Sequence, residues 1–146
     1  MLRFALLYHQ CPPAYQRPSH WDLMLEAGNT LRTWALAELP SDWRVAHGAT
    51  VAACGECPPL AVGSEVEAEL LVDHRTAYLD YEGPVSGGRG NVTRVAAGVY
   101  DETTVGSSQL EIVVSVGDWT GRIVMSRDPE DESRWRLICR PISAGG

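Results

Sequence analysis

The feature that most limits the fold of this chain is a series of short segments in which apolar and polar residues alternate, separated by glycine and proline. Alternation with a period of two is typical of β-strands, because successive side chains of a strand point to opposite faces. The segments that show it most clearly are residues 2–8, 20–26, 31–37, 91–100, 109–116, 119–126 and 134–140. Many short strands joined by such turns are typical of a β-sandwich or a β-barrel. We predict a mainly β fold, a small antiparallel β-barrel with short flanking helices or loops.

Four further segments are less regular. Residues 49–53 are expected to form a short strand. Residues 64–72 fit either an alternating strand or a helix opened by a capping box, and we favour the strand. Residues 77–82 alternate again, which predicts a strand with one polar face. That face would carry Tyr78, Asp80 and Glu82. Residues 128–133 are acidic and include a proline, so they are expected to form a longer turn.

Composition and charge limit the partners of the chain. Its 146 residues carry a formal net charge of -7, and they show neither an internal repeat nor a linker, so residues 1–146 are expected to form one domain. An acidic domain has no general attraction for nucleic acid, so binding would need a local basic site or a partner. No segment approaches the roughly 20 apolar residues of a membrane span, and the apolar N-terminal run is too short for a signal peptide. We therefore expect a cytoplasmic protein that does not bind membranes.

The cysteines do not form a recognisable metal or redox motif. Cys54 and Cys57 form a single C-x-x-C pair, without the second pair that a structural zinc site normally has. The prolines that follow do not fit a thioredoxin-like turn into a helix. Together with Cys11 and Cys139, these residues are best interpreted as incidental thiols, with zinc binding and redox chemistry as the alternatives.

Residues 20–26 contain the strongest candidate for a functional site. If this segment is a strand, its two faces differ in chemistry. One face carries Trp21, Leu23 and Leu25, and the other carries His20, Asp22, Met24 and Glu26. Such alternation is ordinary for an edge strand with one face in water. However, an imidazole and a carboxylate projecting together from a rigid strand are also a suitable pair of metal ligands, so alternation alone leaves both interpretations open.

Several short motifs in a fixed order resemble the 3′-phosphoesterase domain of bacterial DNA ligase D. The motifs are His9, the segment from His20 to Glu26, the segment from Leu31 to Ala35, Asp73-His74 with Tyr78, and Tyr81-Glu82-Gly83. The resemblance covers roughly residues 4–140, which is almost the whole chain. It implies a compact β-barrel with a cleft. It also implies a manganese-dependent hydrolase of DNA repair that removes a 3′-terminal phosphate or ribonucleotide from a primer end.

The resemblance also implies roles for individual residues. By position, His9, His20 and Asp22 match the metal ligands, while His74 and Tyr78 match the catalytic residues that bind the phosphate. Two histidines and one carboxylate suit manganese, with zinc or iron as alternatives. The implied partners are a nucleic acid 3′ end and a separate ligase or polymerase. Asp80 and Glu82 are expected to orient the ligand histidines.

The chain departs from the family at three basic positions. Met24 stands where the family has an arginine, Glu38 stands where it has a lysine, and Val66 aligns with another basic residue. The candidates to replace the missing basic residues are Arg17, Arg32, Arg75 and Arg89. The departures leave an alternative function open, a non-catalytic metal- or anion-binding module of a repair complex. A weaker alternative is an enzyme for a small phosphoester, which needs fewer cations than a DNA end.

Overall fold

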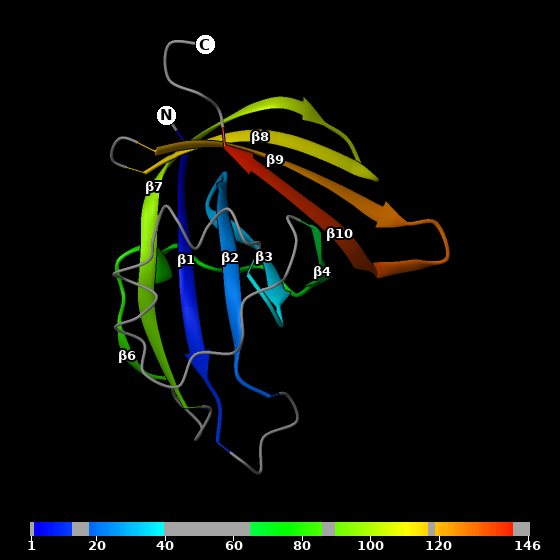
Figure 1. Cartoon of the computed structure of the whole chain (residues 1–146). Coiled ribbons are helices and arrows are strands. Elements are labelled where there is room, and N and C mark those ends of the chain that lie inside the picture. The colour runs from blue at the N-terminus through cyan, green and yellow to red at the C-terminus, as the bar shows by residue number, and fades with distance from the viewer. Residues whose placement is uncertain (1, 13–17, 40–64, 86–89, 117–118, 142–146) are drawn as a thin grey trace.

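Figure 1 shows the computed structural model of the chain, which describes residues 2–12, 18–39, 65–85, 90–116 and 119–141. The strand expected at residues 49–53 and the pair Cys54 and Cys57 lie outside these described residues. No helix in the described part has the length and apolar character that crossing a membrane requires.

Ten strands and one short 3₁₀ helix make up the described residues. The strands are β1 (Leu2–Gln10), β2 (His20–Ala27), β3 (Thr30–Leu36), β4 (Glu65–Leu70), β5 (His74–Arg75), β6 (Gly83–Pro84), β7 (Asn91–Val105), β8 (Gln109–Val116), β9 (Trp119–Asp128) and β10 (Asp131–Pro141). The helix η1 (Thr76–Leu79) lies between β5 and β6.

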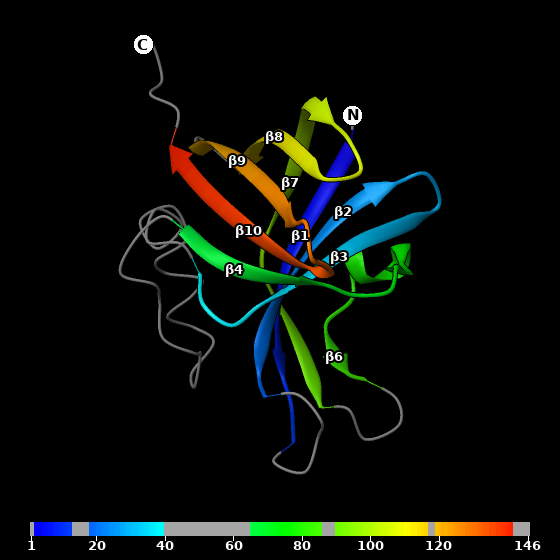
Figure 2. The same ribbon diagram turned by 90° about the vertical axis from the view of Figure 1, so that its right-hand side faces the viewer.

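Eight of the strands close into an antiparallel barrel, which confirms the predicted fold (Figures 1 and 2). They follow the order β1-β2-β3-β4-β10-β9-β8-β7, and β7 pairs back with β1. The two short strands lie outside the ring, where β5 pairs with β3 and β6 pairs with β7. Closure pairs every edge of the sheet, so the barrel strands are held in a fixed register.

The barrel interior is filled by the side chains that the alternating pattern placed on one face. Trp21, Trp34 and Trp135 are its largest fully buried residues, and the rings of Trp34 and Trp135 meet edge to face at 5.7 Å. Leu23 and Leu25 follow Trp21 into this core, as predicted from the sequence. Each buried ring removes a large apolar surface from water, so these residues are a main source of stability.

The opposite face of β1, β2, β3 and β7 is also covered, contrary to the idea of an edge strand with one face in water. A second apolar cluster lies there, formed by Ala5, Leu7, Met24, Leu31, Leu79, Val85 and Val92. Leu79 comes from η1, and Val85 follows β6, so these two elements pack on the outside of the barrel. Figure 2 shows β6 running beside β7. Polar residues on this face are therefore held in a partly dry environment.

Two predictions of local structure need correction. Residues 77–82 do not form a strand, because η1 occupies Thr76–Leu79. The three-residue spacing of Tyr78 and Tyr81 brings their rings edge to face at 5.7 Å, whereas an extended strand would put them on opposite faces. The turn expected at residues 128–133 is shorter, since β9 and β10 already pair at Asp128 and Asp131. The ambiguous segment 64–72 contains β4, in agreement with the favoured interpretation.

Candidate metal centre

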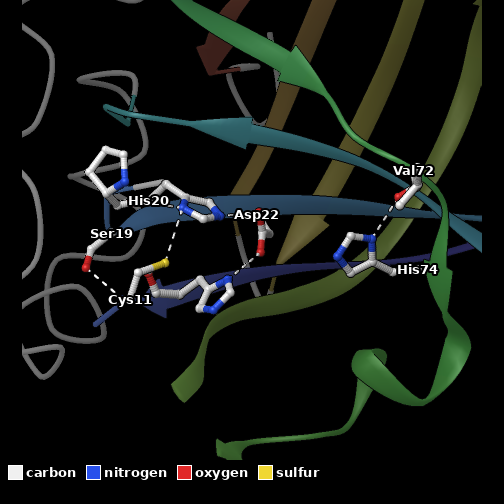
Figure 3. A network of polar contacts seen from close by, with 8 residues as sticks. Cys11, Ser19, His20, Asp22, Val72 and His74 are labelled. Carbon is white, nitrogen blue, oxygen red and sulfur yellow. Dashed lines mark hydrogen bonds and ion pairs between the residues drawn. The ribbon is translucent and has the colours of Figure 1, made fainter. Parts of the chain in front are cut away.

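The register of β1 and β2 brings two of the predicted metal ligands together. His9 and His20 lie directly opposite each other, and their ring centroids are 5.0 Å apart. Residues that oppose each other in an antiparallel pair project from the same face of the sheet. Asp22 is two residues further along β2 and shares this face with His20 (Figure 3). Because its carboxylate lies near both imidazoles, all three predicted ligands gather at one place.

Asp22 lies between the two imidazoles. Its Oδ1 is 3.1 Å from His20 Nε2, and its Oδ2 is 3.7 Å from His9 Nδ1. The side chains of Asp22 and His20 are only 3% and 6% exposed. Burial raises the pKa of Asp22, but the proximity of His20 and His9 outweighs burial and keeps that pKa below its ordinary value. The carboxylate is therefore ionised at neutral pH, as a metal ligand must be.

The backbone before β2 selects the nitrogen that His20 presents to the site. His20 Nδ1 is 2.8 Å from the carbonyl oxygen of Pro18, which can only accept a hydrogen bond, so Nδ1 carries the proton and donates it. In the neutral ring, Nε2 then faces the Asp22 carboxylate with a lone pair. Two hydrogen-bond acceptors, His20 Nε2 and Asp22 Oδ1, would repel each other at this distance. Either a second proton on the His20 ring or a cation bound to both atoms removes the repulsion. In a metal-bound histidine, the ring nitrogen that does not bind the metal usually donates a hydrogen bond to a carbonyl or carboxylate oxygen.

An unpaired buried oxygen supports the same conclusion. Asp22 Oδ1 is inaccessible to solvent and accepts no well-aligned hydrogen bond from the described residues, although His20 Nε2 is close. An unsatisfied buried polar atom is costly, and more so when it is charged. A divalent ion between Asp22 and the two histidines would satisfy this atom. The three residues could therefore hold a divalent metal ion.

Cys11 belongs to the same cluster and was missed by the sequence analysis. The donor atoms of His9, Cys11 and His20 all lie within 4.8 Å of one another, so this group can hold a metal ion. Cys11 Sγ is 3.9 Å from His20 Nδ1 and 3.8 Å from the carbonyl oxygen of His9. A signal was present, since His9 and Cys11 are two residues apart, the same spacing as His20 and Asp22.

His74 and Tyr78 lie together, but at a different point of the same side. His74 opposes Leu31 of β3, which in turn opposes Glu26, four residues beyond Asp22 along β2. Its ring packs edge to face on Tyr78 at 5.8 Å, and its Nδ1 is 2.9 Å from the carbonyl oxygen of Val72. Figure 3 shows His74 and Asp22 on the same side of the strands, with His74 beside β4 and the chain that follows it. The structure therefore presents two separate groups of candidate residues on this side, offset by four residues, or about 13 Å, along β2.

The described arginines proposed as replacements for the missing basic residues do not face this site. The Arg32 guanidinium stacks over the Trp34 ring at 4.9 Å, so it lies on the interior side of β3. Arg75 is exposed and follows His74, so it points to the other side of β5. Arg17 and Arg89 lie outside the described residues.

Arg94 is a better candidate, and the sequence did not suggest it. Leu7 opposes Asp22 on one side and Arg94 on the other, so the three residues form one row across β2, β1 and β7. Arg94 Nη1 donates to the carbonyl oxygen of Leu79 at 3.3 Å, which places the guanidinium beside η1 and Tyr78. Only the register across β1 brings this cation near the site.

The three departures from the family have different structural meanings. Met24 is buried in the outer apolar cluster, so no charge stands at this position. Val66 points into the barrel interior, where a basic side chain would not reach the outer face. Glu38 is exposed. Of these residues, Met24 therefore bears most directly on the site.

Asp80 and Glu82 take partners other than the ligand histidines they were expected to orient. Asp80 forms an ion pair with Arg3 at 2.7 Å, and this contact lowers the pKa of Asp80. Glu82 accepts a hydrogen bond from the backbone N–H of Arg94 at 3.2 Å. Both residues therefore anchor the segment around η1 to the barrel.

Comparisons with known proteins do not identify a family. No protein-family model matches the chain, and no curated protein gives a significant sequence match. The resemblance to the 3′-phosphoesterase domain therefore stays a prediction from the motifs.

Proposed function

We propose that this protein is a metal-dependent phosphoesterase that acts on the 3′ ends of DNA or RNA-tailed primers during end repair. The observation that carries the proposal is the convergence of His9, His20 and Asp22 on two rigid strands, with Asp22 Oδ1 buried and without a well-aligned hydrogen bond among the described residues. A divalent ion held there, manganese by the resemblance, would supply Lewis acidity toward a phosphoryl oxygen. Three protein ligands leave coordination positions open for water and substrate.

The second group of residues supports the handling of a phosphate. His74 and Tyr78 present an imidazole and a phenol on the same side as the metal centre, and both can hydrogen-bond to phosphoryl oxygens or protonate a leaving oxygen. The Arg94 guanidinium donates to the carbonyl oxygen of Leu79, the residue after Tyr78, and can make charge-assisted hydrogen bonds to an anion. In the proposed reaction, water attacks phosphorus, the P–O bond to the nucleotide breaks, and a 3′-hydroxyl is left for a separate polymerase or ligase.

The direct test is phosphate release from a 3′-phosphorylated primer–template with manganese. We expect His20→Ala to abolish the activity, because it removes one ligand of the metal and the partner of Asp22. Gln10→Ala is the matched control, since Gln10 is exposed and points away from the face that carries His9. The proposal fails if the unmodified protein releases no more phosphate than His20→Ala.

One observation favours a second function, a non-catalytic module that binds a metal or an anion within a repair complex. Met24 is buried among apolar side chains at the position where the family has an arginine, and the net charge of the chain is -7. Loss of one donor to a developing oxyanion typically costs about 3–4 kcal/mol of transition-state stabilisation. This function predicts metal binding in calorimetry without turnover, and manganese-dependent phosphate release would exclude it.

A further inference from the structure

We propose that Cys11 is a fourth ligand of the metal centre and that it makes the centre prefer a thiophilic ion such as zinc over manganese. This inference rests on the metal centre of the proposed function, but not on phosphoesterase activity. It goes beyond the resemblance, which implies His9, His20 and Asp22 alone.

The carboxylate of Asp22 and the two imidazoles are spaced nearly as in a small tetrahedral site, and Cys11 lies close enough to the histidines to join it by a change of rotamer. Asp22 Oδ1 is 3.1 Å from His20 Nε2, and Asp22 Oδ2 is 3.7 Å from His9 Nδ1. Cys11 Sγ is 3.9 Å from the other nitrogen of the His20 ring, Nδ1. Metal–nitrogen bonds of about 2.0–2.1 Å and metal–sulfur bonds of about 2.3 Å place neighbouring tetrahedral donors roughly 3.3–3.6 Å apart. The two distances between Asp22 and the imidazoles differ from this range by a few tenths of an ångström, and the donor atoms of His9, Cys11 and His20 all lie within 4.8 Å of one another.

The backbone holds Cys11 at this position. The backbone N–H of Cys11 donates to Ser19 Oγ at 2.9 Å, which ties the end of β1 to the residue that precedes His20. On the other side, Gly90 packs so closely that a Cβ there would lie 1.9 Å from the carbonyl oxygen of Gln10 and 3.2 Å from Cys11 Cα. These two contacts therefore fix the position of Cys11 close to the histidines.

A second, independent observation points to a cation at the same place. Asp22 is buried, its Oδ1 lacks a well-aligned hydrogen bond among the described residues, and this oxygen lies 3.1 Å from His20 Nε2. An ion bound by Asp22 and His20 Nε2 needs Cys11 Sγ to turn toward it. The contact of Sγ with the His9 carbonyl oxygen is long, at 3.8 Å, and a change of rotamer can exchange it for a metal bond.

The chemistry of the donor determines which ion benefits. Thiolate is a soft ligand that binds zinc, cobalt and iron well and manganese poorly. With zinc, all four protein donors can bind, which gives the closed coordination of a structural site. With manganese, we expect His9, His20 and Asp22 to bind and Cys11 to stay apart, which leaves positions open. Cys11 would then determine both the preferred metal and whether the site can accept a substrate.

The test is cobalt binding followed by absorption spectroscopy in a Cys54→Ser/Cys57→Ser background, which removes the C-x-x-C thiols. Cys139 is fully buried in the barrel core and is present in every sample. We expect a thiolate-to-cobalt charge-transfer band, together with the intense visible bands of tetrahedral cobalt. Cys11→Ser should remove the charge-transfer band, and Cys11→Ala provides a second variant in case the serine disturbs folding.

Competition titrations supply a second readout that is independent of turnover. Cys11→Ser should weaken zinc binding by at least about tenfold while changing manganese binding by less than about threefold. Cobalt bands that depend on His20 but lack the charge-transfer component would overturn the role of Cys11 and leave the metal centre intact. Absence of any His20-dependent cobalt binding would overturn both. A charge-transfer band without phosphate release would support Cys11 and contradict the proposed activity.

Discussion

Asp22 is the residue on which the candidate site depends most. It is a buried carboxylate between two imidazoles. The alternation of side chains along β2 predicted that it shares a face with His20 and lies near it. The alternation did not predict that this face is buried, because the covering residues Leu79 and Val85 come from distant parts of the chain. Cys11 was missed because it follows the last residue of β1, so its two-residue spacing from His9 extends beyond the alternating segment.

The lowered pKa of Asp22 predicts how the metal-free protein responds to acid. The unfolded pKa of an aspartate is about 3.9. Because the folded value is lower, the contribution of Asp22 to stability is complete above the unfolded pKa and is lost as the pH falls through the folded pKa. Urea unfolding between about pH 5 and pH 2.5, with a chelator present, should show a steeper loss for the unmodified protein than for Asp22→Asn. Parallel curves would contradict this assignment.

At the scale of elements, the site depends on contacts between strand ends. The end of β1 lies against Gly90, just before β7, and Ser19, just before β2, binds Cys11. The sequence predicted most of the strands, but it predicted a strand where η1 forms. The error arose because Tyr78, Asp80 and Glu82 alternate, whereas the packing follows the three-residue spacing of Tyr78 and Tyr81.

Gly90 and Gly28 provide a matched test of the contact at the strand ends. Both have positive φ, at 92° and 62°, but a Cβ on Gly28 meets nothing within 4 Å, while one on Gly90 would lie 1.9 Å from the Gln10 carbonyl oxygen. Gly28→Ala should therefore cost only the backbone strain, about 1–2 kcal/mol. Gly90→Ala should cost more and should also weaken metal binding, because Gln10 and Cys11 must move. Thermal unfolding and zinc titration of the two variants measure both effects. Equal losses of stability and of zinc affinity in the two variants would show that the contact of Gly90 with Gln10 does not support the site.

Arg94 tests the link between β7 and η1. Arg94→Met keeps the length of the side chain but removes the cation that lies beside Leu79 and Tyr78. If Arg94 binds the phosphate, the rate of phosphate release should fall by at least about tenfold, with little change in manganese affinity. Thr93→Ala is the control, since Thr93 is exposed and points to the opposite face of β7. Equal rates for the two variants would remove Arg94 from the site.

At the scale of the whole molecule, closure of the barrel explains how a chain of short segments builds a rigid site. The sequence predicted the barrel because alternation and turn residues recur along the chain. It did not predict the partner strands, since the pairing of β1 with both β2 and β7 depends on contacts between distant residues. That pairing places Asp22, Leu7 and Arg94 in one row.

The net charge of -7 predicts weak and metal-dependent binding of nucleic acid. Few phosphates can contact the described cations, so the logarithm of the binding constant should fall with the logarithm of salt with a slope no steeper than about -3. Fluorescence anisotropy with a 3′-phosphorylated end, with and without manganese, measures this slope. A steep slope without manganese would indicate an extended basic surface that the account does not contain.

The most direct test of the central claim is the rate of 3′-phosphate release as a function of manganese bound per chain. The account predicts a rate that rises with the binding of one manganese ion and stays at background in His20→Ala at every manganese concentration. It also predicts that Gln10→Ala behaves like the unmodified protein. The same rate in His20→Ala and in the unmodified protein would show that the reaction does not use the centre formed by His9, His20 and Asp22.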